Sequence, residues 1–180
     1  MHDKYVSSAG GSGRLPVMEL DETRWREIQA LASFQGTSAP KAVVVAVNSI
    51  IDKSLRAAAW SSMNTTGSTT AWSCWVVTER SVGHVLIKYK KAEYDEREER
   101  QKELTPSSWS VWVRPLADVI GLRYGAFYAV ESNPTVFDPA EPIKVIFSDG
   151  AVNIPAGPIP IDQRAEVGRI TSALREFVNF

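Results

Sequence analysis

The sequence contains little of the chemistry on which disulfides, metal sites and polar catalytic clusters depend. Its 180 residues include one cysteine, Cys74, and two histidines. A single cysteine cannot form a disulfide within the chain, and a structural zinc site needs four nitrogen or sulfur ligands that this composition does not offer. We therefore expect neither a metal site nor a cofactor.

An excess of charge of one sign is also lacking. Twenty basic residues face 21 acidic ones, for a formal net charge of −1. Nucleic-acid-binding proteins usually carry a basic excess, and anionic membranes attract positively charged proteins. We therefore expect no nucleic-acid partner and no general attraction to anionic membranes, which leaves a local membrane-binding patch open.

Long apolar runs are missing too. The N-terminal stretch MHDKYVSSAGGSGRLP lacks the apolar core of a signal peptide. The longest apolar run, AVVVAV at residues 42–47, is much shorter than the ~20 residues of a membrane-spanning helix. These absences predict a soluble, cytoplasmic protein.

The N-terminal third of the chain is interpreted as a tail followed by helix. Residues 1–16 are rich in Gly and Ser and predict a flexible tail. Residues 17–60 predict an N-terminal helical extension, in which Asp21 is a suitable N-cap and Gly36 a suitable stop. The apolar positions of its first helix are Trp25, Ile28, Leu31 and Ala32.

Residues 42–50 fit two structures, and the pattern does not choose between them. The β-branched run Val43–Val47 favours a strand. The helical spacing of Val43, Val47 and Ile50 favours a helix, as do Pro40 before them and Ala57–Ala59 after them. The polar stretch SSMNTTGSTT, residues 61–70, predicts a loop.

From residue 70 the sequence is typical of strands. Runs rich in β-branched and aromatic residues occur at 70–79, 82–90, 108–113 and 117–130. The charged stretch KKAEYDEREERQKELTPSS separates the second run from the third and has almost no apolar content. We expect it to be an exposed excursion that adds nothing to a core, helical in part through the pairs Glu93/Arg97 and Glu96/Arg100.

The last forty residues predict a hairpin and a closing helix. Asp149-Gly150 is a preferred pair for a two-residue type I′ turn, in which both residues take a positive φ. Asp162 is the expected N-cap of a helix over 163–178. One face of this helix is apolar and must be buried, and the preceding sheet offers the nearby surface. The apolar face comprises Val167, Ile170, Leu174, Phe177 and Val178.

Three of these features occur together in a known family. WVVTERSV at 75–82 is similar to a strand ending in a Thr-Asp/Glu-Arg turn, and RPLADVIGL at 114–122 is similar to a Pro-Leu-x-Asp-Ile/Val strand entry. With the closing hairpin and helix, residues from about 71 to 178 resemble a bacterial pleckstrin-homology-like (PH-like) domain. The resemblance implies an α+β fold, with a PH-like domain over 61–180 that ends in the closing helix 163–178.

In that family a strongly curved antiparallel sheet of seven strands, the PH-like barrel, is capped by the C-terminal amphipathic helix. A full set of seven strands would take one strand from residues 42–50. The N-terminal helical extension and the charged excursion depart from the simplest family pattern.

The resemblance also implies a function. Such domains mostly bind proteins or lipids and are not catalytic, and members that bind phosphoinositides carry basic residues in the first loop. The corresponding stretch here, residues 61–70, has no Lys or Arg. We therefore expect a non-enzymatic interaction or scaffold module that binds a protein partner or associates with itself. The alternatives are a peripheral membrane adaptor and an enzyme with an unrecognised site.

Tryptophans are the candidate contact residues. Trp72 and Trp75 have opposite parity in one predicted strand, and Trp109 and Trp112 have opposite parity in another, so one of each pair faces outward unless both faces are covered. Exposed aromatic residues are favoured interface anchors. The alternative is that the N-terminal helix covers them.

The remaining polar candidates do not form a site. His84 has no His, Cys or carboxylate cluster around it in the sequence, and Cys74 lies within a predicted strand, as a small buried residue would. No phosphate-binding, dinucleotide-binding or metalloprotease motif occurs. No catalytic residue is predicted.

Overall fold

The protein is described by a computed structural model over residues 20–51, 56–102, 104–130, 133–139, 141–155 and 159–178. The predicted tail, residues 1–16, lies outside these ranges. In chain order the helices and strands are α1 (Glu22–Ala32), α2 (Lys41–Ile50), β1 (Ala57–Thr66), β2 (Thr69–Thr78), β3 (Ser81–Tyr89), α3 (Glu96–Gln101), β4 (Ser108–Pro115), β5 (Val119–Arg123), β6 (Phe127–Val130), β7 (Asn133–Pro139), β8 (Ile143–Phe147), β9 (Gly150–Ile154) and α4 (Arg164–Phe177). Short 3-10 turns, η1 (Leu116–Asp118) and η2 (Ile161–Gln163), precede β5 and α4.

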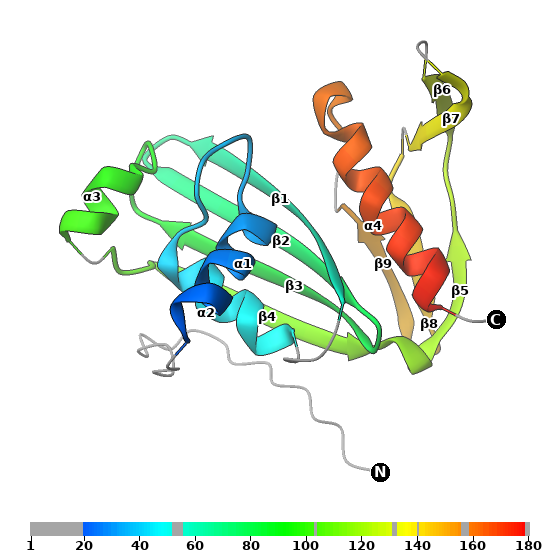
Figure 1. Ribbon diagram of the computed structural model, residues 1–180, viewed down its shortest axis with the longest axis horizontal. Coiled ribbons are helices and arrows are strands. Elements are labelled where there is room, and N and C mark those ends of the chain that lie inside the picture. Colours follow the sequence, from blue (N-terminus) through cyan, green and yellow to red (C-terminus); the bar gives the residue numbers. More distant parts are fainter. Residues whose placement is uncertain are drawn as a thin grey trace. The chain divides into compact units, whose positions relative to one another are not determined.

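The described strands form three sheets. Their strand orders are β1-β2-β3-β4, β5-β8-β9 and β6-β7 (Figure 1). The expected α+β class, antiparallel sheets and C-terminal helix are therefore present. The described strands do not close into a single barrel, so the strongly curved PH-like barrel stays a prediction.

The chain divides into two compact units. Unit 1 holds α1, α2, α3 and most of the four-stranded sheet, within the described residues of 1–54, 61–74 and 83–113. Unit 2 holds the described residues of 55–60, 75–82 and 114–180, and thus β5 to β9 and α4. Each of the strands β1 to β4 contributes a segment to both units.

In unit 1 the helices α1 and α2 cover one face of the four-stranded sheet (Figure 1). Asp21 caps α1 as predicted, because its carboxylate accepts a hydrogen bond of 2.8 Å from the Arg24 backbone N–H. Gly83 on β3 lets α2 approach closely, since a Cβ there would lie 2.9 Å from the Ile50 side chain. The buried apolar residues of this layer include Ile28, Ala32, Val43, Val44, Val47, Trp72, Val85 and Ile87.

The structure resolves one open assignment and corrects two sequence interpretations here. Residues 42–50 form helix α2 and not a strand, because the helical spacing buries Val43, Val47 and Ile50 together. Residues 61–70 belong to β1, a two-residue turn and β2, so the predicted loop is wrong, and Ala57–Ala59 begin β1 where a helix was favoured.

Polar strand residues are possible there because their hydroxyls are hydrogen-bonded. Ser61 Oγ donates to the Ala32 carbonyl at 2.7 Å, and Thr70 Oγ1 donates to the Lys91 carbonyl at 2.9 Å. Burial of a hydroxyl costs little when it keeps a hydrogen bond. The polar sequence of this segment explains why strand β1 was not predicted.

In unit 2 the hairpin of β8 and β9 is confirmed, but its turn differs from the prediction. Phe147 pairs with Gly150, so the loop residues are Ser148 and Asp149. Asp149 does not have a positive φ, whereas Gly150 has a φ of 156°. The type I′ assignment to Asp149-Gly150 was wrong by one residue, because a one-residue change in register places Gly150 in the strand.

The closing helix α4 buries the predicted apolar face except at Phe177, which is half-buried. Val167, Ile170 and Leu174 are at most 1% exposed, and so are Ile143 and Val145 of the three-stranded sheet in the same unit. Asp162 is not the N-cap: it lies in the turn η2, and Gln163 occupies the cap position. Gln163 is itself buried.

Candidate interaction surface on the four-stranded sheet

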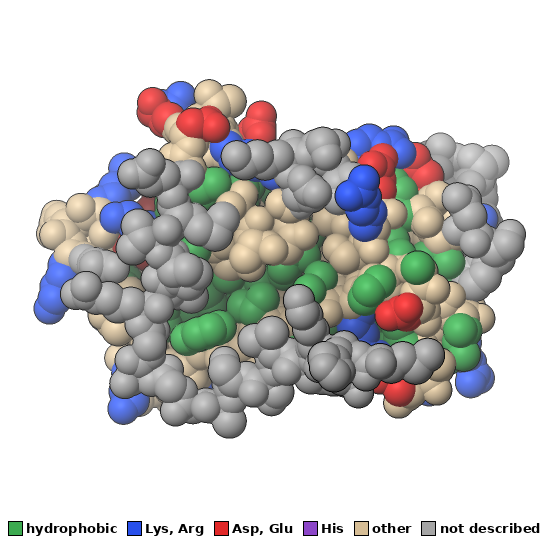
Figure 2. All heavy atoms as spheres, turned by 90° about the horizontal axis from the view of Figure 1, so that it is seen from below, with side chains coloured by type: hydrophobic (Ala, Val, Ile, Leu, Met, Phe, Trp, Pro, Cys, Tyr) green, Lys and Arg blue, Asp and Glu red, His purple; other side chains and the backbone are tan. Residues whose placement is uncertain are grey.

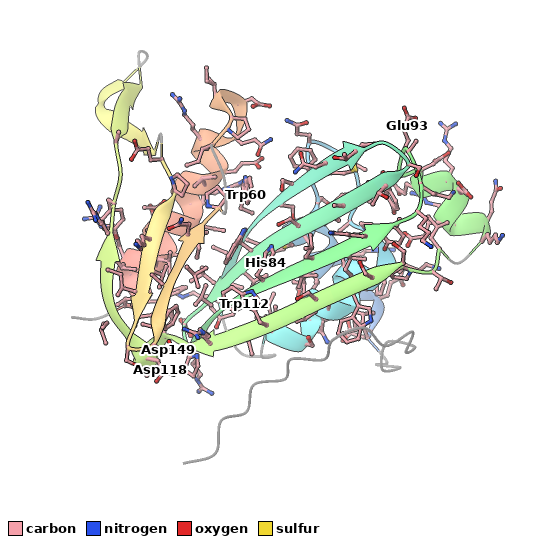
Figure 3. All side chains as sticks on the ribbon, turned by 180° about the vertical axis from the view of Figure 1, so that it is seen from behind. Trp60, His84, Glu93, Trp112, Asp118 and Asp149 are labelled. Carbon is pink, nitrogen blue, oxygen red and sulfur yellow. The ribbon has the colours of Figure 1, made fainter. Side chains whose placement is uncertain are left out.

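The face of the unit 1 sheet opposite α1 and α2 carries a small polar and aromatic group. Gly83 faces α2, so its neighbour His84 faces the other way, since successive residues of a strand alternate between faces. His84 Nε2 lies 2.7 Å from Ser73 Oγ on the adjacent strand β2. The Trp112 ring of β4 lies 6.2 Å from the His84 ring between centroids (Figure 3).

Burial controls the protonation of this group. It lowers the pKa of His84 to about 4, because a half-buried imidazolium loses hydration. His84 is therefore neutral at pH 7, and its ring shares one hydrogen bond with the Ser73 hydroxyl. A base with so low a pKa accepts a proton weakly, so the arrangement favours recognition over proton transfer.

The four predicted tryptophans have different environments. Trp72 and Trp75 are 0% and 3% exposed, so neither is accessible to a partner in this structure. Trp109 and Trp112 on β4 are half-buried and remain accessible. Trp72 and Trp75 point to opposite faces of β2, so both faces of this strand are covered at these positions.

Strand β4 is the most exposed apolar strand of the unit 1 sheet. Within the described residues it pairs on one side only, with β3. Its segment SWSVWV has no charged residue, and Val113 is 52% exposed. Figure 2 shows the molecule from below the view of Figure 1, and hydrophobic side chains gather near the middle of that face.

A buried carboxylate, which the sequence did not predict, lies at the other side of unit 1. Glu99 of α3 is 6% exposed, and its two oxygens lie 3.1 and 3.2 Å from the Lys41 backbone N–H, the first of α2. It also accepts a 2.7 Å hydrogen bond from the Tyr94 hydroxyl. A carboxylate is stabilised at the positive end of a helix, so Glu99 anchors the charged excursion to α2. The expectation that this excursion adds nothing to the folded core was therefore wrong.

A cavity of about 220 Å³ adjoins this carboxylate. It has two acidic and two basic neighbours, and Glu96 pairs with Arg100 across one helical turn. The lining favours no single ligand charge. Its lining residues are Trp25, Gln29, Lys41, Glu96, Glu99 and Arg100.

Cys74 is a packing residue in this structure. Its side chain is fully buried, and burial raises the pKa of the thiol to about 12. The thiolate that nucleophilic chemistry needs is therefore scarce at pH 7. In the described part of the chain, no three His, Cys, Asp or Glu side chains gather as a metal site would require.

No family model matches the chain, and no curated protein and no solved structure is detectably similar to it. Among the described helices, none is both long enough and apolar enough to cross a membrane.

Proposed function

We propose that this protein is a non-enzymatic interaction module with a PH-like fold, and that it self-associates through strand β4. The order of its elements supports the fold. A four-stranded sheet is followed by a three-stranded sheet, β5-β8-β9, and then by a buried helix, which is the order that the PH-like family has. The hairpin β6-β7 is then an insertion between β5 and β8.

The observation that carries self-association is the outer edge of β4. An edge strand presents unpaired backbone N–H and C=O groups to any extended chain, and proteins usually protect such edges with charge, proline or a short strand. Residues 108–113 have neither charge nor proline. This edge is therefore suited to pairing with another strand.

A second copy of β4 is a complementary occupant. An antiparallel pair centred on Val111 would place Trp109 opposite Val113 of the second copy, and Ser110 opposite Trp112. Residues that face each other across an antiparallel pair lie on the same side of the sheet. The exposed Val113 would then be covered by an aromatic ring, and each serine would face an indole that can donate a hydrogen bond.

Sedimentation velocity across a concentration series tests this proposal. We expect the wild-type chain to form dimers, and Val113→Lys to raise the dimer dissociation constant at least about tenfold, because a lysine at an edge opposes strand pairing. Val113→Thr, which keeps β-branching without a charge, is the matched control and should dimerise nearly as well as wild type. A wild-type chain that stays monomeric at ~100 μM would refute self-association, because its dimer dissociation constant would then exceed that of most specific complexes.

A further inference from the structure

The outer face of the three-stranded sheet in unit 2 carries two positive charges side by side. In the ladder of β5, β8 and β9, Leu122, Val145 and Val152 are aligned, and Val145 is fully buried. The neighbouring rows alternate to the opposite face. One outer row contains Gly121, Ile146 and Ala151, and the next contains Arg123, Lys144 and Asn153.

The two cations are not neutralised within the described structure. Arg123 pairs directly with Lys144 in the ladder, and both side chains are exposed. Like charges directly opposite each other destabilise a sheet. No ion pair joins either side chain to another described residue, and the nearby Glu141 carboxylate accepts from the Ala126 backbone N–H. The folded chain therefore tolerates a repulsion that an external anion would relieve.

The adjacent outer row is apolar and shallow. Ile146 is half-buried and lies between Gly121 and Ala151, neither of which has a side chain large enough to cover it. The register of β5 shifts between Val119 and Gly121, and Ile120 at that shift is 64% exposed. An apolar strip and a cationic pair thus lie next to each other on one face.

We propose that this face, defined by Ile120, Ile146, Arg123 and Lys144, binds an extended acidic segment of a protein partner. Residues two apart in an extended chain project to the same side and lie ~6.6–7 Å from each other. The two outer rows are also two residues apart along each strand, so the spacing of such a segment matches them. An apolar side chain of the segment covers Ile146, and an Asp or Glu two positions away lies between Arg123 and Lys144. This surface shares no residue with the β4 edge and goes beyond the proposed self-association.

The charge pattern favours a peptide over other anions. Nucleic acid affinity depends on many phosphate contacts, and this face offers two cations. An anionic membrane attracts proteins that carry an excess of positive charge over a broad surface, whereas the net charge of this chain is −1. A local pair of cations beside an apolar strip instead matches one acidic side chain and one apolar side chain.

Fluorescence anisotropy with a labelled peptide of Ser-Val-Ser-Glu repeats provides the test. We expect saturable binding that weakens at about 0.5 M NaCl, where exposed charges are screened. Lys144→Glu should weaken it at least about tenfold, because the new carboxylate pairs with Arg123 across the ladder and leaves no net positive charge for the peptide. The control Arg169→Glu changes an equally exposed cation on α4, which is 71% exposed, and should bind the acidic peptide as wild type does.

Three outcomes would overturn the proposal. The first two are no binding of the acidic peptide and equal binding of that peptide by Lys144→Glu and wild type. The third is Lys144-dependent binding that prefers vesicles with ~20% phosphatidylserine or single-stranded DNA to the peptide, since the net anionic charge of the ligand governs binding to both. Two cross-checks distinguish peptide binding from self-association. Sedimentation velocity of Lys144→Glu tests whether this variant still dimerises, and anisotropy with Val113→Lys tests whether that variant still binds the peptide. Each variant should lose only its own activity.

Discussion

The two larger sheets differ in how their edges are protected. In unit 2 both edge strands are five residues long, β5 has an irregular register, and β9 is followed directly by Pro155. In unit 1 the edge strand β4 is eight residues long and uncharged until Arg114. Short strands, bulges and prolines are devices that prevent edge pairing. These devices are absent along most of β4, and β1, the other edge strand of that sheet, also lacks charge and proline. What β4 adds is the exposed apolar side chain of Val113.

The two sheets also differ in the charge on their outer faces, and here unit 2 is the one with groups that are not satisfied. The unit 1 face carries the neutral pair Ser73–His84, whose groups satisfy each other. The unit 2 face carries Arg123 and Lys144, whose charges repel. In the two proposals, unit 1 offers an edge to another strand and unit 2 offers a face to an acidic side chain. The following variants compare how much the free energy of unfolding depends on buried residues and on exposed ones in the two units.

The largest effect is expected in the core of unit 2. Leu174→Ala should lower the free energy of unfolding by ~2–5 kcal/mol, because it removes a fully buried side chain and leaves a cavity. Chemical denaturation measures this loss. Glu176→Ala, at an exposed ion pair with Arg56, should stay within about 0.5–1 kcal/mol. Equal denaturation midpoints for Leu174→Ala and wild type would show that α4 is not part of the core.

Gly83→Ala should disturb the core of unit 1. A Cβ at this position would lie 2.9 Å from both Ile50 Cδ1 and the Trp112 carbonyl oxygen, so α2 and β4 must shift, at a cost of ~1–3 kcal/mol. Gly121→Ala is the matched strand glycine, since its Cβ would meet only Ile146, at an ordinary 3.6 Å. Denaturation midpoints that change equally in the two variants would contradict the close packing of α2 on β3.

The face of unit 1 predicts a pH dependence of stability. The folded pKa of His84, about 4, lies below its ordinary value of 6.5, so the unfolded chain binds more protons between these values. Stability should therefore fall as pH decreases through this window, by about 2 kcal/mol between pH 7.5 and pH 5 from this residue. His84→Gln should remove that part of the slope in denaturation measured at both pH values. An unchanged slope would mean that His84 is well hydrated.

The smallest effect is expected at the β4 edge. Val113 is 52% exposed, so Val113→Lys should change the unfolding free energy of the monomer by no more than about 0.5 kcal/mol. Denaturation at a concentration below the dimer dissociation constant measures it. A loss of several kcal/mol would mean that Val113 belongs to the core, and that its effect on association is indirect.

Sequence patterns predicted the elements whose residues act locally. Helix α1 with its cap Asp21 follows from neighbouring residues, and so does the apolar face of α4. The hairpin 143–154 was also found, although its turn was displaced by one residue. Helix α3 formed where the pair Glu96/Arg100 indicated a helix.

Long-range contacts decided what the patterns missed. Strand β1 is polar, and the hydroxyl of Ser61 is stabilised by the Ala32 carbonyl of a distant helix. Glu99 is buried because it binds a backbone N–H 58 residues away in the sequence. Trp72 and Trp75 are both buried although they point to opposite faces of β2, and a strand sequence does not show that both of its faces are covered.

Hydrogen exchange of the β4 amides, followed at low and high protein concentration, tests the central claim most directly. If β4 pairs with a second copy, the exchange of amides within residues 108–113 should slow as the concentration rises through the dimer dissociation constant, while amides of β5 and β9 keep their rates. The Val113→Lys variant should show no such concentration dependence. Exchange in β4 that is independent of concentration in the wild-type chain, or slowing in β5 or β9 instead, would contradict the assignment of the interaction site to the β4 edge.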